Sequence, residues 1–178
     1  FLWSVIDETD PHVLKTVVLN GGYESAFRGL RNTTANADKY QCNVPWIIIF
    51  DPTSACNKHC IGCWSADYEE CDKIVTQGSE LGCHLYMMTG GEPLVRKKDV
   101  LRLAEEHNDC LFNIFTNASL IDQPFCDEVK RLGNIVFSIS LEGYEDTNDA
   151  RRGDGSYDEV MRAMDLLHKN GLLFGTST

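Results

Sequence analysis

Strand and helix signals alternate from residue 45 onward, and this order constrains the fold more than any other feature. Short apolar runs predict strands at 46–50, 85–88, 111–115, 135–141 and 172–176. Helical spacing fills the intervals at 67–81, 97–107, 123–132 and 157–169, with Ser156 or Asp154 expected to cap the last helix. Parallel strands need helix-length crossovers, so the pattern predicts an α/β fold with a parallel sheet, either open or closed into a barrel.

The first 44 residues lack this alternation. They are predicted to form an N-terminal helical or irregular extension, residues 1–44, in front of a core at residues 45–178. The triplet Thr9-Asp10-Pro11 predicts a helix start, because proline is tolerated in the first turn. Asn20-Gly21-Gly22 predicts the end of that helix, since glycine pairs are typical of turns.

Charge and hydropathy argue against two classes of partner. The net charge of -11 would repel a phosphate backbone, so no nucleic-acid partner is expected. No apolar run approaches the roughly 20 residues that span a bilayer, so no membrane partner is expected. The sequence shows no secretory signal, and a cytoplasmic location is predicted.

Cys56, Cys60 and Cys63 stand close together among eight cysteines. Thiolates are soft ligands that suit an iron–sulfur cluster or zinc. Three cysteines would leave one iron of a 4Fe-4S cluster open, whereas a closed zinc site would need a fourth ligand such as His59 or Cys71. The spacing leaves open a cluster, a zinc site and simple packing. The scattered cysteines are predicted to be packing residues, and three histidines to face solvent: Cys71, Cys83, Cys110 and Cys126; His84, His107 and His168.

Unusual polar and glycine residues follow each of the first four predicted strands. Sites in parallel α/β folds lie beyond the carboxyl ends of the strands, so these residues are expected to share one site. They are the cysteine segment, Thr89–Pro93, Thr116-Asn117, and Ser138, Ser140, Glu142 and Gly143.

Four segments together resemble the radical S-adenosylmethionine (radical SAM) superfamily, over about residues 45–178. Cys56-x3-Cys60-x2-Cys63 is similar to its cluster motif, and Gly90-Gly91-Glu92-Pro93 to its GGEP motif. Ser140–Gly143 resembles its SLDG segment, and Asn148–Gly153 its HDxxRG segment. Two positions depart from the pattern. Gly62 stands where many members carry an aromatic residue, which puts the adenine contact in doubt, and Asn148 replaces the histidine.

The resemblance implies a role for each matching residue. The three motif cysteines would each ligate one iron, and the SAM methionine moiety would chelate the fourth. Gly90 and Gly91 would let the backbone approach that moiety, and Glu92 would accept a hydrogen bond from its ammonium group. The other implied contacts are Thr116 and Asn117 lining the SAM pocket, Ser140 and Glu142 at the ribose, and Arg152 at the SAM carboxylate.

The implied fold is a partial (βα)6 TIM-like barrel, truncated near the start of strand five, with both chain ends expected to be cuts. The implied activity is reductive cleavage of SAM to a 5′-deoxyadenosyl radical, which abstracts hydrogen from a small-molecule or peptide substrate. An electron donor such as flavodoxin or ferredoxin is implied, and the fragment alone is expected to be inactive. The alternatives are a zinc-binding structural module and a catalytically degenerate cluster-binding scaffold.

Overall fold

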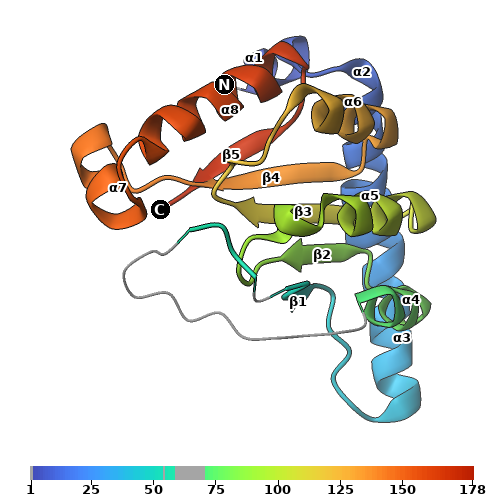
Figure 1. Ribbon diagram of the computed structural model, residues 1–178. Coiled ribbons are helices and arrows are strands. Elements are labelled where there is room, and N and C mark those ends of the chain that lie inside the picture. Colours follow the sequence, from blue (N-terminus) through green and yellow to red (C-terminus); the bar gives the residue numbers. More distant parts are fainter. Residues whose placement is uncertain (1, 54, 59–70) are drawn as a thin grey trace.

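The computed structural model describes residues 2–53, 55–58 and 71–178. Five parallel strands form one sheet in the order β1-β2-β3-β4-β5 (Figure 1). Their bounds are Ile48–Phe50 (β1), Leu85–Met88 (β2), Leu111–Thr116 (β3), Ile135–Ser140 (β4) and Phe174–Ser177 (β5). The register runs straight across the sheet, with Tyr86 beside Phe112 and Phe112 beside Ile135. The predicted parallel α/β sheet is therefore confirmed.

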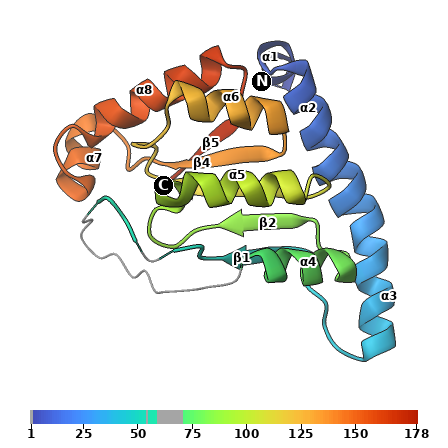
Figure 2. The same cartoon turned by 45° about the vertical axis from the view of Figure 1, so that its right-hand side comes forward.

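Helices connect the strands, and α4, α5, α6 and α8 lie on the same face of the sheet (Figures 1 and 2). The connecting elements are α4 (Cys71–Leu81), the 3-10 helix η2 (Pro93–Arg96), α5 (Lys97–Glu106), α6 (Gln123–Leu132), α7 (Glu145–Arg152) and α8 (Ser156–Lys169). Helix α7 has no counterpart in the sequence prediction. Its only buried residue is Asn148, so no apolar period marks it.

The core lies between the sheet and these helices. Alternate residues of the central strands point toward the helices and are fully buried, among them Tyr86, Phe112, Ile114 and Phe137. The rings of Tyr86 and Phe112 stack with centroids 5.7 Å apart. Each such buried side chain contributes roughly 1.5–3 kcal/mol to folding.

The opposite face of the sheet is not covered by any helix among the described residues. Ile49 is 62 % exposed on this face, and Ser138 and Ser140 are partly exposed. The strand predicted at 46–50 is confirmed over Ile48–Phe50, but only Phe50 is buried, whereas an apolar run of this kind is typical of a buried strand.

The N-terminal segment forms helices α1 (Leu2–Glu8), α2 (Pro11–Val17), η1 (Val18–Gly29) and α3 (Leu30–Tyr40). The predicted start at Asp10 is confirmed, because its carboxylate accepts a hydrogen bond from the His12 N–H at 2.9 Å. From α2 through α3 the helices run across the N-terminal ends of the strands (Figure 2).

The predicted helix end at residues 20–22 is wrong, because tertiary contacts explain these residues. The Asn20 side-chain amide donates to the carbonyls of Asn108 (2.8 Å) and Cys110 (2.9 Å). A Cβ atom on Gly21 would lie 3.1 Å from the Leu111 side chain. The small residue thus allows the helix to approach β3 rather than ending the helix.

Helix α8 is capped by a residue from the preceding helix. Asp149 accepts hydrogen bonds from the backbone N–H groups of Gly155 (2.6 Å) and Tyr157 (2.8 Å). These hydrogen bonds lower the pKa of Asp149, and the bond from Tyr157 contributes most. The predicted cap, Ser156 or Asp154, is wrong, since Gly155 holds the cap position and Asp149 supplies the acceptor.

Replacing Asp149 with alanine is expected to lower the urea midpoint of unfolding at neutral pH, because two N–H groups at the start of α8 lose their acceptor. Because the pKa of Asp149 is lower in the folded state, its carboxylate stabilises the folded protein at any pH above its ordinary pKa of about 3.9. This stabilisation is lost as the pH falls through the folded-state pKa. The difference in urea midpoint between the variant and the unmodified protein should therefore become smaller at acidic pH. The exposed neighbour Asp154→Ala is the control, and equal midpoints for the two variants would contradict the assignment.

Candidate functional site

The C-terminal ends of β1 to β4 meet at one edge of the sheet, where most of the predicted site residues come together. The described residues there are Cys56, Gly90, Gly91, Glu92, Thr116 and Asn117, with Ser140, Glu142 and Arg152 at the end of β4 and in the helix that follows. Cys60 and Cys63, the other two predicted iron ligands, lie outside the described residues.

The loop after β2 holds the segment that leads to Cys56. Gly90 has φ +100°, and a Cβ atom there would lie 2.8 Å from the Thr53 carbonyl oxygen. The Gly91 N–H donates to that carbonyl, and the Glu92 N–H donates to the Ala55 carbonyl, both at 2.9 Å. Glycine is therefore needed at position 90 for close approach of two backbones that shape the cysteine segment.

Glu92 links the loop after β2 to the end of β3. Its side chain is buried, and its carboxylate accepts hydrogen bonds from the Leu94 N–H (3.0 Å), the Thr116 hydroxyl (2.7 Å) and the Asn117 N–H (2.8 Å). Burial raises the pKa of Glu92, and the three donors oppose that rise. Its predicted bond to the SAM ammonium group stays a prediction.

Thr116 and Asn117 have different surroundings although both were assigned to the pocket wall. The Thr116 hydroxyl is buried and donates to Glu92, because strand alternation places this side chain with the helix-facing row. Thr116 therefore faces Glu92 on the helix-covered side, and its predicted place in the SAM pocket stays a prediction. Asn117 instead faces the cysteine segment.

Asn117 joins β3 to the cysteine segment. Its side-chain amide donates to Asn57 Oδ1 at 3.0 Å and lies 4.0 Å from the Cys56 sulfur. Its side-chain oxygen accepts from the Ser119 hydroxyl at 2.6 Å, and Asn57 in turn donates to Ser119 at 2.9 Å. The sequence prediction missed Asn57 and Ser119, since an isolated polar loop residue carries no periodic signal.

A charged contact anchors the same segment from the other side. The Lys58 ammonium lies 2.6 Å from Glu159 of α8, and the Lys58 N–H donates to the Cys56 sulfur at 3.4 Å. The side chains of Lys58 and Glu159 are only 18 % and 34 % exposed, so this pair is screened less than a surface pair. The start of the cysteine segment is thus held at both sides.

An ion-pair cluster lies beyond the end of β4. Glu142 accepts hydrogen bonds from Arg152 at 2.5 Å and from Arg151 at 2.8 Å. The hydrogen bond from Arg152 is the main cause that lowers the pKa of Glu142. Asn148 is fully buried, accepts from the Glu142 N–H at 3.1 Å and donates to Ser156 at 2.9 Å. Asn148, which departs from the family pattern, therefore holds the turn that presents Glu142.

The uncovered face and the ion-pair cluster offer groups that fit S-adenosylmethionine. Arg152 Nε is buried and has no hydrogen-bond partner among the described residues, so a donor is available beside Glu142. Ser140 lies in register with Ser177 on the uncovered face, and Ser138 there donates to Asn113 at 3.0 Å. A free guanidinium donor suits a carboxylate, and hydroxyl and carboxylate groups suit a ribose.

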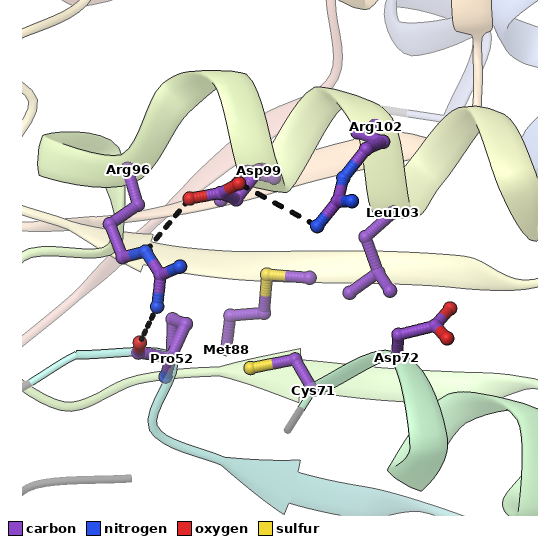
Figure 3. Close-up of a pocket in the computed structure, with 9 residues that line it drawn as sticks. Pro52, Cys71, Asp72, Met88, Arg96, Asp99, Arg102 and Leu103 are labelled. Atoms are coloured by element: carbon purple, nitrogen blue, oxygen red, sulfur yellow. Dashed lines mark hydrogen bonds and ion pairs between the residues drawn. The ribbon is translucent and has the colours of Figure 1, made fainter. Parts of the chain in front are cut away.

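A separate pocket of about 160 Å³ lies on the helix-covered side, between α4 and α5 (Figure 3). Two of its arginines share one carboxylate, since Arg96 donates to Asp99 at 2.9 Å and Arg102 lies 3.7 Å from the same carboxylate. Arg96 also donates to the Pro52 carbonyl at 3.1 Å. Cys71 lines this pocket, and burial raises the pKa of its thiol. Arg96 thus braces the exit of β1 from the side opposite the uncovered face.

The model of the radical SAM superfamily matches residues 50–178. An uncharacterized protein of Archaeoglobus fulgidus is 35% identical over 127 residues, which cover 65% of this chain and 30% of that protein. Fe-coproporphyrin III synthase of Methanosarcina barkeri is 27% identical over 142 residues, covering 72% of this chain and 35% of the synthase. The chain thus spans about a third of the length of these relatives.

The fold is similar to that of solved structures of SuiB. Streptococcus suis SuiB bound to S-adenosylmethionine superposes with a TM-score of 0.66 at 20% identity, over 84% of this chain and 36% of SuiB. SuiB bound to the precursor peptide SuiA gives a TM-score of 0.64 at 19% identity over the same shares. Identities this low show likeness of fold alone.

The chain belongs to the radical SAM superfamily, whose cofactors are a 4Fe-4S cluster and S-adenosylmethionine. The predicted α/β, TIM-like barrel class is confirmed. In the described segments, no helix combines the length and hydropathy needed to cross a bilayer.

Proposed function

We propose that this protein is a radical SAM enzyme in which Cys56, Cys60 and Cys63 hold a 4Fe-4S cluster at the C-terminal edge of the sheet. The observation that carries the proposal is the placement of Cys56. The loop after β2 fixes the segment before it through two backbone hydrogen bonds, and Asn117 and Lys58 contact its sulfur. When reduced and bound to SAM, the cluster supplies the electron that cleaves SAM to methionine and a 5′-deoxyadenosyl radical.

The remaining residues bind and orient the cofactor in this proposal. The backbone of Gly90, Gly91 and Glu92 approaches the methionine moiety. Gly91 leaves no side chain in the way, and Gly90 lets the loop pack against the Thr53 carbonyl. Arg152 donates its Nε–H, which has no hydrogen-bond partner in the described part of the chain, to the SAM carboxylate. Ser140 and Glu142, at the end of β4, accept hydrogen bonds from the ribose hydroxyls. Asn117 lines the pocket next to the cluster.

The proposed partners follow from charge and from the uncovered face. A small molecule or a peptide is the substrate and reaches the uncovered face of the sheet. Flavodoxin or ferredoxin is the electron donor, and the location is cytoplasmic. No nucleic acid is a partner, since the chain has a net charge of -11.

The test is an EPR experiment on protein purified without oxygen, reconstituted with iron and sulfide, and reduced. A reduced 4Fe-4S signal is expected, and adding SAM is expected to change it, because one iron lacks a cysteine ligand. The Cys60→Ala variant should lose the SAM-sensitive signal. Cys126→Ala is the matched control, since this cysteine is fully buried in α6 away from the site.

Two results would overturn the proposal. The first is a cluster signal that does not respond to SAM in the unmodified protein. The second is bound zinc without acid-labile sulfide at the three motif cysteines, which would support a structural zinc module instead.

A further inference from the structure

A second group of metal-ligand side chains lies at the opposite edge of the sheet from the cysteine segment. His84 precedes β2, and Asp109 and Cys110 precede β3. His84 and Cys110 are 4 % and 0 % exposed, so the prediction that His84 faces solvent is wrong. In the part of the chain that the structure describes, these three residues are the group whose ligand atoms all lie within 4.8 Å of one another.

The three side chains contact one another through two thiol contacts and one long histidine–carboxylate contact. His84 Nδ1 lies 3.4 Å from Asp109 Oδ2 and 3.8 Å from the Cys110 sulfur, which lies 3.7 Å from Asp109 Oδ1. An ordinary N–H···O bond has a donor–acceptor distance of about 2.7–3.2 Å. The nearby His107–Asp72 pair reaches 3.0 Å, so His84 and Asp109 form the looser of the two histidine–aspartate pairs.

The ligand atoms lie near the spacing that one tetrahedral zinc ion requires, and His84 and Cys110 approach different oxygens of Asp109. Zinc–sulfur bonds of about 2.3 Å and zinc–nitrogen or zinc–oxygen bonds of about 2.0–2.2 Å place neighbouring ligand atoms about 3.4–3.6 Å apart. We propose that His84, Asp109 and Cys110 form an open zinc site with three protein ligands, which joins the beginnings of β2 and β3 beneath η1. Water takes the fourth position on the open side, where the Asp109 side chain is 49 % exposed.

The charges also balance for a divalent ion. A neutral His84, an ionised Asp109 and a Cys110 thiolate carry two negative charges together, equal and opposite to Zn²⁺. Burial is the main cause that raises the pKa of the Cys110 thiol, and Asp109 raises it further. The thiol therefore carries its proton without metal, and zinc binding releases that proton to solvent. The donor set of one sulfur, one nitrogen and one oxygen suits zinc better than the hard ions magnesium or calcium.

The backbone around this group is already fixed by contacts that do not involve the three side chains. The Leu111 N–H donates to the His84 carbonyl at 2.8 Å, and Asn20 of η1 donates to the Cys110 carbonyl at 2.9 Å. Ligands on a rigid backbone pay little ordering entropy on binding. A site at this edge acts on stability, since the N-terminal face of such barrels is remote from the chemistry.

The test removes the other thiolate cluster first. A variant with Cys56, Cys60 and Cys63 all changed to serine is prepared metal-free and titrated with zinc alone against a competing chelator. One zinc per chain is expected, and its X-ray absorption spectrum should show one sulfur neighbour with nitrogen and oxygen neighbours. Adding Asp109→Ala should weaken binding more than about 100-fold, since loss of even an outer-shell partner costs about 10- to 100-fold.

The controls separate ligand loss from misfolding. Asp109 is exposed, so Asp109→Ala leaves the core intact, and circular dichroism verifies the fold; Cys110→Ala is the second ligand variant. Asp72→Ala removes the carboxylate of the other His–Asp pair and should leave zinc affinity unchanged. No retained zinc in the triple-serine protein, or equal affinities for Asp109→Ala and Asp72→Ala, would overturn the site. Neither result tests the iron–sulfur cluster, because the triple-serine variant lacks the three cysteines proposed to bind it.

Discussion

Replacing Glu92 with alanine is expected to lower the free energy of unfolding by about 3 kcal/mol. The variant removes the common acceptor of the Leu94 N–H, the Thr116 hydroxyl and the Asn117 N–H, two of which are buried contacts. A buried donor left without a partner costs about 1–3 kcal/mol, and part of this cost is offset because the carboxylate no longer has to be buried. Chemical denaturation with urea measures the difference.

The same variant should also disturb the cluster site, because Glu92 positions Asn117 and Asn117 contacts Asn57 and Cys56. Glu106→Ala, at an exposed carboxylate at the end of α5, is the matched control and should unfold like the unmodified protein. Glu92→Gln keeps one acceptor oxygen and should fall between the two. If Glu92→Ala were as stable as Glu106→Ala, the linking role of this carboxylate would be wrong.

Changing Gly90 to alanine is expected to have the second large effect. The new Cβ atom would lie 2.8 Å from the Thr53 carbonyl oxygen and 2.9 Å from Asp51 Cβ, and φ at this position is +100°. The two backbones must therefore separate, which weakens the hydrogen bonds that shape the segment before Cys56. Less cluster per chain is expected after reconstitution, measured by iron and sulfide content.

Gly153 offers a control with nearly the same backbone conformation. Its φ is +101°, and a Cβ atom there would meet nothing within 4 Å. Gly153→Ala is therefore destabilised by the unfavourable φ alone. The Gly90→Ala variant should be less stable than the Gly153→Ala variant by about 1–3 kcal/mol, the usual cost of a forced close contact. Equal losses of stability would show that conformational strain, and not the approach to Thr53, requires glycine at position 90.

Part of the site could be predicted because neighbouring strand ends in a parallel sheet share an edge. Once the strands were located by their apolar runs, the residues after β1, β2 and β3 had to meet, and Cys56, Glu92 and Asn117 do meet. The direction of single side chains was less predictable. Thr116 and Asn117 are adjacent in sequence, yet strand alternation directs one toward Glu92 and the other toward Asn57.

Other features escaped prediction because their causes are far away in the sequence. Asn20 and Gly21 have the composition of a turn, but contacts with the loop before β3 and with Leu111 keep them helical. His84 stands next to a predicted strand end, yet the neighbouring loop at Asp109 and Cys110 buries it. Intrinsic propensities describe a residue and its neighbours along the chain, whereas these contacts join residues far apart in the sequence, such as His84 with Asp109 and Asn20 with Asn108.

By itself the sequence determined the parallel α/β class, the succession of strands and helices along the chain and the cysteine motif, because these depend on periodicity and spacing along the chain. Only the tertiary structure decided which side chains meet: Glu92 with β3, Asp149 with α8, and His84 with Cys110. The physical reason is that hydrogen bonds and ligand geometry act over about 3–4 Å in space. Packing alone brings distant segments of a chain within that range.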